Sequence, residues 1–158
     1  MVVLAGCVGC NQAAESLARS RLQGREVVSL LGGTVRLQYV ENSGGFLSLG
    51  ASLPGRWRTA VFTIGGAGLV AAMLSYAVLA FEGAWQPIVA LSLICGGGIG
   101  NLVDRLRHHG YVVDYLNIGI GSLRTGIFNV ADVALMAGII LIIIQQSAVK
   151  RPVDRRGR

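Results

Sequence analysis

The sequence predicts a membrane protein: an all-α bundle of four transmembrane helices with a small extracytoplasmic β-sheet in the first loop. Three observations support this fold class. The 158 residues are 53% apolar and 14% charged, which is far more apolar than a soluble protein of this size. Three runs of 21 to 25 residues carry at most one charge, so each can cross a hydrocarbon core about 30 Å thick. The length allows one domain, residues 1–158.

The first predicted span, residues 1–14, is uncharged but short. As a helix it would reach roughly 21 Å at about 1.5 Å per residue, which is less than a full crossing. We therefore expect a truncated first transmembrane helix, as if its start site were placed too late. Polar residues between Asn11 and Leu22 mark the region where this helix ends.

The loop of residues 24–56 is expected to form the sheet. Residues 34–40 alternate between apolar and polar side chains and include β-branched ones, and glycines interrupt the pattern on both sides. Pro54 and Gly55 indicate a turn before the second span.

The other spans are expected at residues 59–81, 83–103 and 127–149. The third contains four closely spaced glycines: Gly96, Gly97, Gly98 and Gly100. Small residues let membrane helices approach closely, so we interpret these glycines as packing positions. With four spans, the loops after the first and third helices lie on the same face of the membrane. Polar groups at the end of the third helix and the start of the fourth therefore meet on that face.

The net charge of +6 is interpreted as membrane topology, and no nucleic-acid partner is expected. Five basic residues fall in residues 150–158, which indicates a cytoplasmic tail, although six arginines also lie in the first long loop. The three cysteines, Cys7, Cys10 and Cys95, lack the further ligands that a zinc site needs. We expect them to be small apolar filler and expect no metal.

Several polar residues lie at the ends of the apolar spans, where ionisable groups are functional candidates. Asn101, Asp104 and Arg105 share one face of the third helix, and Asn129 and Asp132 lie one turn apart in the fourth. Since these two helix ends are expected on the same face, their side chains can line one cleft.

Asp114 lies in an apolar segment of the third loop, residues 111–116, which we expect to dip into the membrane or to pack on the sheet. Two carboxylates brought together there cannot easily both ionise, so they share a proton. The ionised member can then take a proton from water while the protonated one donates to a substrate carbonyl, as in aspartic proteases. The candidate pair is Asp114 and Asp132.

Other chemistries fit the sequence less well. A Ser–Lys protease is disfavoured because the only lysine, Lys150, lies in the tail on the opposite face, and a zinc protease would need an HExxH motif. His108 and His109 are expected to be solvated. For each single aspartate, an ion pair with an arginine or a helix cap is the alternative interpretation.

Taken together, these motifs resemble the lipoprotein signal peptidase (signal peptidase II) family of four-span aspartic peptidases. The resemblance rests on GGGIGNLVDR, GYVVDYL and FNVAD, with YVENSGGFLSLG and SLARSRL in support. It implies that Asp114 and Asp132 are the catalytic pair. It also implies that Asp104 is structural or supports Arg105. The residues that would line the site and hold the substrate are Asn42, Gly44, Asn101, Arg105 and Asn129.

The resemblance further implies a function: removal of signal peptides from diacylglyceryl-modified prolipoproteins, with the cut before the lipidated cysteine. The implied location is the bacterial inner membrane, with the active site near its outer face. The implied partners are prolipoproteins and membrane lipid, and we expect a monomer with no cofactor.

One segment departs from the family pattern. Asn11 and Glu15 stand where the family usually has an aspartate and a lysine, so a family ion pair is missing. This departure motivates a second hypothesis, a non-catalytic paralogue that binds lipidated peptides or lipoproteins. A third hypothesis is a small proton-coupled carrier, but a carrier would need deep polar groups on both faces.

Overall fold

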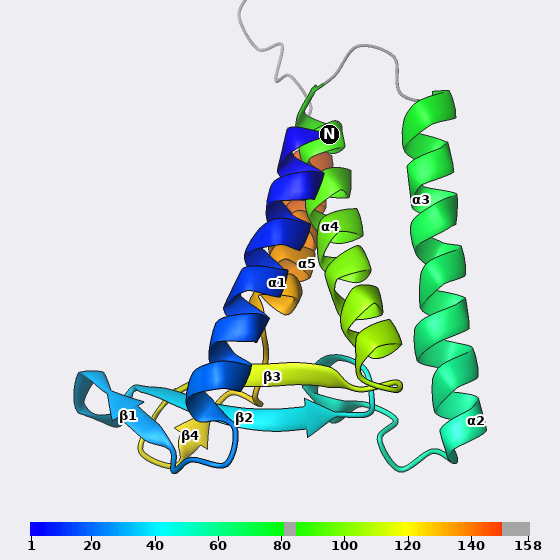
Figure 1. Ribbon diagram of the computed structural model, residues 1–158. Helices are drawn as coiled ribbons and strands as arrows, with labels where there is room; N and C mark the ends of the chain where they lie inside the picture. Colours follow the sequence, from blue (N-terminus) through cyan, green and yellow to red (C-terminus); the bar gives the residue numbers. More distant parts are fainter. Residues whose placement is uncertain (81–84, 150–158) are drawn as a thin grey trace, which may run out of the picture.

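A computed structural model describes residues 1–80 and 85–149 of the chain. Three parts of the expected elements lie outside the described residues: the last residue of the second span, the first two residues of the third span, and the basic tail, residues 150–158. Long helices stand side by side on a small sheet that crosses one end of them (Figure 1). The helices are α1 (Val2–Leu22), α2 (Gly55–Arg58), α3 (Gly66–Ala80), α4 (Trp85–Arg107) and α5 (Val130–Val149).

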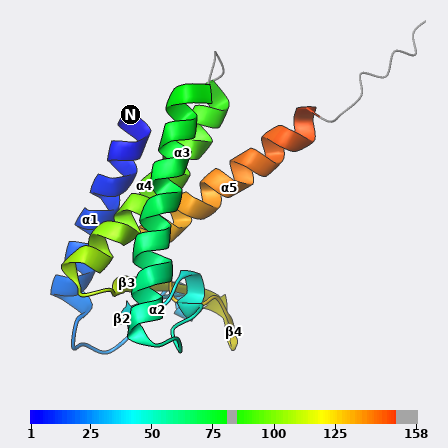
Figure 2. The ribbon, with the colours of Figure 1, turned by 90° about the vertical axis from the view of Figure 1, so that its right-hand side faces the viewer.

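The helix α4 is central to the bundle, because it packs against α1, α3 and α5. A π-helical segment, η3 (Thr59–Gly65), joins α2 to α3, so that these three segments form one long helix. Figure 2 shows that α5 leans away from the other helices toward its C-terminal end. The start of α5 therefore lies close to α1 and α4, next to the sheet.

Within the described residues, three helical segments are long and apolar enough to cross a membrane: Gly55–Leu79, Trp85–Arg107 and Val130–Ser147. The helix α1 is not among them, because polar side chains occupy its second half. It continues to Leu22, eight residues beyond the apolar run from which we expected a truncated helix. A membrane crossing by α1 stays a prediction.

The sheet has four antiparallel strands in the order β1-β2-β3-β4. Its strands are β1 (Val28–Leu30), β2 (Val35–Asn42), β3 (Val112–Ile120) and β4 (Leu123–Arg124). We expected the sheet in the first loop alone, but β3 and β4 come from the loop between α4 and α5. The apolar segment around Asp114 thus forms a strand of the sheet, paired with β2 at Val40.

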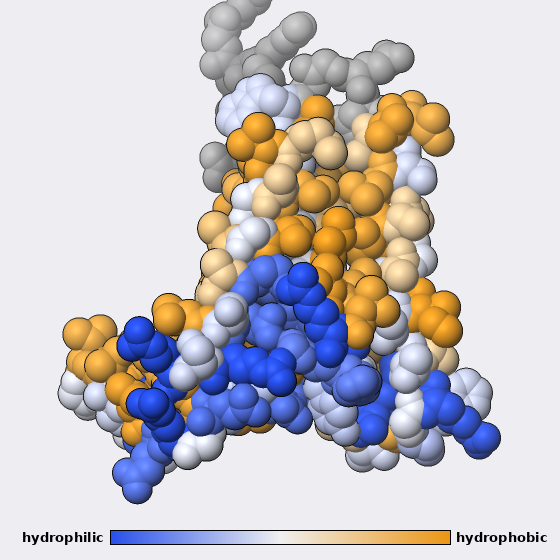
Figure 3. All heavy atoms as spheres, in the orientation of Figure 1, coloured by the Kyte–Doolittle hydropathy of each residue, from blue (hydrophilic) through white to orange (hydrophobic). Residues whose placement is uncertain are grey.

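The surface separates into two zones (Figure 3). Hydrophobic side chains cover the helices, and hydrophilic ones gather at the end that carries the sheet. This distribution fits helices in a hydrocarbon layer and a sheet at the membrane–water boundary.

Close contacts between helices depend on glycine in α4. A Cβ atom added to Gly97 would lie 2.3 Å from the carbonyl oxygen of Ala131 in α5, and one added to Gly96 would lie 2.7 Å from Cys7 Cβ in α1. No side chain fits at either distance, so the glycines allow α4 to touch both neighbours. The interpretation of these glycines as packing positions is therefore confirmed.

Candidate active site

Asp114 is buried in β3, with 2% of its surface exposed. Two side-chain amides donate to its carboxylate: Asn42 Nδ2 to Oδ2 and Asn129 Nδ2 to Oδ1, both at 2.9 Å. Burial raises the pKa of Asp114 to about 7 and the nearby charge of Asp132 adds to this, although the two amide hydrogen bonds favour the ionised form. Asp114 therefore changes its charge near neutral pH.

Asp132 lies in the first turn of α5, where it forms a reciprocal cap with Asn129. Asn129 Oδ1 accepts the backbone N–H of Asp132 at 2.9 Å, and Asp132 Oδ2 accepts the backbone N–H of Asn129 at 3.3 Å. The spacing of three residues is that of a capping box. Asn101 Nδ2 also donates to Asp132 Oδ1 at 3.0 Å. The carboxylate of Asp132 is thus held by its own helix terminus and by α4.

Asn129 connects the two carboxylates. Its Nδ2 donates to Asp114 and also to Asn101 Oδ1 at 3.1 Å, while its Oδ1 binds the backbone of Asp132. Both aspartates are buried, at 2% and 5% exposure, and their charges interact. Two carboxylates in such a place favour a state with one shared proton. The arrangement can therefore present a base and an acid within one hydrogen-bonded network.

Arg105 ties the loop after β2 to α4. Its Nη2 donates to the carbonyl oxygen of Gly44 at 2.7 Å and its Nη1 to that of Asn101 at 3.2 Å, and its guanidinium lies 5.8 Å from the centre of the Phe62 ring. Gly44 N–H in turn donates to Asn42 Oδ1 at 2.9 Å. A Cβ atom on Gly44 would lie 2.5 Å from the carbonyl oxygen of Leu49, so only glycine fits this turn.

Asp104 lies apart from the other candidate residues. It is fully buried, and its Oδ1 accepts a hydrogen bond from Gln12 Nε2 of α1 at 2.6 Å. The hydrogen bonds of Arg105 go to backbone carbonyls instead of to Asp104. Of the two roles expected for Asp104, this position favours the structural one. The other seven candidate residues are brought together around Asn129 and Arg105: Asn42, Gly44, Asn101, Arg105, Asp114, Asn129 and Asp132.

Comparison with known proteins assigns the family. The family model described as "Signal peptidase (SPase) II" matches residues 3–148, which is nearly the whole chain. The chain belongs to the signal peptidase II family.

Relatives named lipoprotein signal peptidase agree with this assignment. The protein of Sphingopyxis alaskensis is 41% identical over 110 residues, covering 68% of this chain and 60% of that protein. The proteins of Leifsonia xyli and Moorella thermoacetica are each 34% identical over 142 and 134 residues. These matches cover 86% and 84% of this chain, and 61% and 81% of the relatives. The chain thus spans less than two thirds of the Sphingopyxis and Leifsonia proteins.

Two solved structures, each described as a bacterial membrane enzyme determined by the in meso method, share the fold. One has a TM-score of 0.83 at 23% identity and covers 99% of this chain and 92% of that one. The other has a TM-score of 0.80 at 24% identity and covers 96% and 92%. This signal peptidase II chain therefore shares the fold of both structures.

The two α1 residues that depart from the family pattern have partners in this member. Asn11 Oδ1 accepts the backbone N–H of Ala131 at 3.0 Å. Glu15 Oε1 lies 2.7 Å from His108 Nε2, and Arg19 Nη1 lies 2.8 Å from His108 Nδ1. The expectation that His108 is solvated is wrong, because its side chain is only 14% exposed and contacts α1 through both ring nitrogens. Sequence spacing could not show this pairing between distant segments.

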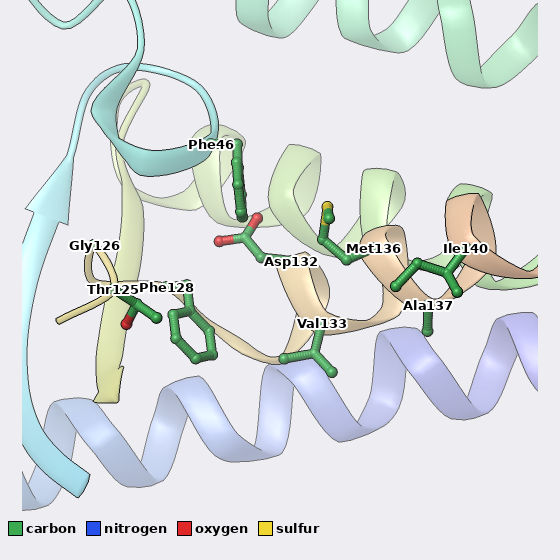
Figure 4. A pocket seen from close by; sticks show the side chains of 9 residues that line it. All are labelled: Phe46, Thr125, Gly126, Phe128, Asp132, Val133, Met136, Ala137 and Ile140. Atoms are coloured by element: carbon green, nitrogen blue, oxygen red, sulfur yellow. The ribbon is translucent and has the colours of Figure 1, made fainter. Parts of the chain in front are cut away.

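Two hollows meet at Asp132 in this signal peptidase II fold. The first, of about 430 Å³, is almost entirely apolar and lies along α5. Figure 4 shows the Asp132 carboxylate directed toward Phe46 beside it. The second, of about 300 Å³, lies between α3 and α4 and includes Asn101 and Arg105. Phe46 and Asp132 line both hollows, and Phe46 is a site residue that the sequence analysis did not single out.

The described residues contain no group of three or more His, Cys, Asp or Glu side chains placed to hold a metal ion. Cys95 is fully buried in α4, as expected for apolar filler, whereas Cys10 is exposed on α1.

Proposed function

We propose that this chain is an intramembrane aspartic endopeptidase. It removes the signal peptide from diacylglyceryl-modified prolipoproteins and cuts before the lipidated cysteine. The observation that carries this proposal is the pair of buried carboxylates, Asp114 and Asp132, which Asn129 links: its side-chain amide donates to Asp114 and its backbone N–H donates to Asp132. Membership of the signal peptidase II family supports the class of substrate.

The chemistry follows from one proton shared by the pair. The ionised carboxylate takes a proton from a water molecule, whose oxygen attacks the carbon of the scissile carbonyl. The protonated carboxyl gives its proton to the carbonyl oxygen, so that a neutral tetrahedral diol forms. When the diol collapses, the carboxyl that took the proton from water gives it to the nitrogen and the C–N bond breaks, while one diol hydroxyl gives its proton to the ionised carboxylate, so that the pair again holds one proton. A pKa of Asp114 of about 7 suits this exchange near neutral pH.

The two hollows fit a substrate with two unlike parts. The apolar cavity of about 430 Å³ matches acyl chains on the cysteine, because its wall is formed mainly by apolar side chains of α5. The smaller hollow offers Asn101 and Arg105, which can bind peptide carbonyls and so orient the signal peptide. Since Asp132 lines both hollows, the bond between the two parts would lie beside the carboxylate pair.

The proposal extends to the setting of the enzyme. We place it in the bacterial inner membrane as a monomer, with α1 as a fourth crossing helix and the sheet at the outer face. Prolipoproteins and membrane lipid are the proposed partners. The hydrophilic end of the molecule, which carries the sheet, supports this placement at a membrane–water boundary (Figure 3).

The decisive experiment is a cleavage assay on a lipidated precursor with Asp114→Asn and Asp132→Asn. Both variants are expected to insert into the membrane and to lose cleavage, because the amide can neither accept nor release the shared proton. Glu41→Gln makes the same chemical change on an exposed side chain of β2 and is expected to cleave normally. Retained cleavage by either aspartate variant would contradict the assignment of the pair.

The second candidate, a paralogue that binds lipidated peptides without cutting them, rests on Asn11 and Glu15. Both residues lie on α1 and bind Ala131 and His108, so the departure leaves the hydrogen bonds of Asp114 and Asp132 in place. The same assay separates the two functions. Binding of the lipidated precursor by the unmodified chain, without product, would favour the paralogue.

A further inference from the structure

Asn11 is a fully buried polar residue inside the apolar first half of α1. It lies where α1, α4 and α5 meet. A Cβ atom on Gly100 of α4 would come within 3.1 Å of Asn11 Nδ2 and 3.2 Å of Ala131 Cβ in α5. The absence of a side chain at Gly100 therefore makes room for the Asn11 amide between the three helices.

The oxygen of this amide binds the start of α5. The first N–H groups of a helix lack partners within the helix and need acceptors from elsewhere. In α5, Asn11 Oδ1 accepts the N–H of Ala131 at 3.0 Å, and Asn129 Oδ1 accepts that of Asp132 at 2.9 Å. Asn11 thus fixes the Val130–Ala131 peptide unit, and Asn129 fixes the next one, which leads into Asp132.

The nitrogen of the amide faces a different helix. Asn11 Nδ2 and Asp104 Oδ2 are both buried without a hydrogen-bond partner among the described residues, and the two side chains are close enough to interact. An amide can accept from α5 and offer a donor to Asp104 at the same time. An ionised carboxylate at this position would keep the acceptor but offer no donor.

Other charged groups surround this junction. Glu15 lies one turn further along α1 and is 5% exposed, Arg105 and His108 are on α4, and Asp132 is on α5. Tyr115 of β3 reaches the same helix start, where its hydroxyl lies 3.4 Å from the N–H of Val130. A negative charge added at Asn11 would therefore lie among several buried carboxylates.

We propose that Asn11 is a positioning residue: its neutral amide holds the first turn of α5, and with it Asp132, in the geometry of the carboxylate pair. The inference rests on the proposed endopeptidase function. An amide satisfies the helix start without adding a carboxylate beside Asp104 and Glu15. The nearly isosteric change Asn11→Asp keeps an oxygen acceptor for the helix start but adds a carboxylate beside Asp104 and Glu15.

The first test is the pH profile of cleavage by Asn11→Asp relative to the unmodified chain. When the introduced carboxyl is protonated, its carbonyl oxygen accepts from Ala131 as the amide oxygen does, and its O–H offers a donor on the side of Asp104 as the amide nitrogen does. When it is ionised, the donor is lost and it repels Asp104 and Glu15. We expect similar kcat values at pH 5 and a loss on the order of tenfold at pH 8, the size of effect that a small misplacement of a catalytic group produces.

KM should be unchanged in this variant, because Asn11 lies between helices and lines neither hollow at Asp132. Asn11→Leu, which removes both polar atoms at similar size, should lower kcat at every pH. Cys10→Ala changes the exposed neighbour on α1 and should behave as the unmodified chain. The inference would be overturned if the kcat of Asn11→Asp, divided by that of the unmodified chain, stayed the same at every pH. A change in KM alone would also overturn it.

A second readout does not depend on activity. Hydrogen–deuterium exchange of the first turn of α5, residues 129–133, should be faster in Asn11→Leu than in Cys10→Ala, because the N–H of Ala131 has lost its acceptor. If the unmodified chain does not cleave a lipidated precursor, the proposed function fails, and this exchange still tests the anchoring role. Equal exchange rates in Asn11→Leu and Cys10→Ala would overturn the anchoring role of Asn11.

Discussion

The two amides that hold Asp114 are themselves oriented by backbone groups. Asn42 Oδ1 accepts the N–H of Gly44 and Asn129 Oδ1 accepts that of Asp132, so both Nδ2 groups must turn toward Asp114. Two N–H donors favour the ionised carboxylate, whereas burial favours the protonated one. The charge of Asp114 is therefore set by a close balance, which places its pKa at about 7.

This balance makes the stability of the protein depend on pH. The pKa of Asp114 is about 7 in the folded chain against 3.8 as the ordinary value, so the folded state binds the proton more tightly. The protonated Asp114 carboxyl stabilises the folded state fully below pH 3.8, and this stabilisation is lost as pH rises to 7. At 1.36 kcal/mol per pKa unit, the loss is at most about 4 kcal/mol. Asp114→Asn does not titrate, so its stability relative to the unmodified chain should rise over this range.

Unfolding of both proteins in one lipid or detergent, at pH 4.5, 6 and 8, measures this difference. Glu41→Gln serves as the matched control, because it turns an exposed carboxylate into an amide and leaves both Asp114 and the neighbouring charge of Asp132 in place. If the free energy of unfolding changed with pH in the same way for Asp114→Asn and the unmodified chain, Asp114 would be ionised throughout this range. The prediction would then be wrong.

Among the helices, the contact between α4 and α5 determines where Asp132 lies. Gly97 touches the carbonyl oxygen of Ala131, one residue before Asp132, so any side chain at Gly97 pushes the start of α5 away from α4. We expect Gly97→Ala to destabilise the protein by about 1 to 3 kcal/mol, the usual range for overpacking. It should also lower cleavage, because Asn101 on α4 would lose its contact with Asp132 on α5.

The matched control is Gly68→Ala in α3, where an added Cβ atom would meet nothing within 4 Å. Alanine favours a helix over glycine by roughly 1 kcal/mol, so this variant should be as stable as the unmodified chain or slightly more stable. Thermal unfolding and the cleavage assay on the same preparations compare the two. Equal effects of both substitutions would contradict a specific role for Gly97.

Helices and strands were predictable from the sequence where the residues of one segment alone determine its secondary structure. Apolar runs with at most one charge located three helices, and the run that predicted a span at residues 127–149 placed the start of α5 within three residues. The pairing of β3 with β2 was missed, because the apolar segment around Asp114 is as compatible with a membrane-dipping loop as with a strand. A short apolar run does not reveal its partner, which lies more than 70 residues away in the chain.

The same limit applies to contacts between helices. Spacing placed Asn101, Asp104 and Arg105 at one end of α4, but it could not show that Asp104 faces α1 while Arg105 binds the Gly44 turn. It also could not show that His108 meets Glu15. Periodicity tells which residues share a face of their own helix, and only the packed structure tells what that face meets.

At the scale of the whole molecule, the sheet and the helix ends that carry the carboxylates lie at one end (Figure 1). Strands β2 and β3 supply Asn42 and Asp114, and helices α4 and α5 supply Asn101 and Asp132 to the same network. A bundle that crosses a membrane must then present this whole site at one face. Which face it is decides whether the active site can meet exported precursors.

Cysteine labelling in intact bacteria tests the proposed orientation. With Cys7, Cys10 and Cys95 replaced by alanine, Ser122→Cys reports on the exposed turn between β3 and β4, and Gln86→Cys reports on the opposite end, at the start of α4. If the sheet faces outward, a membrane-impermeant maleimide should label Ser122→Cys in intact cells and Gln86→Cys only after permeabilisation. The cleavage assay on both variants shows that they are correctly folded. The reverse labelling pattern would place the carboxylate pair at the cytoplasmic face, where it could not cut a precursor at the outer surface.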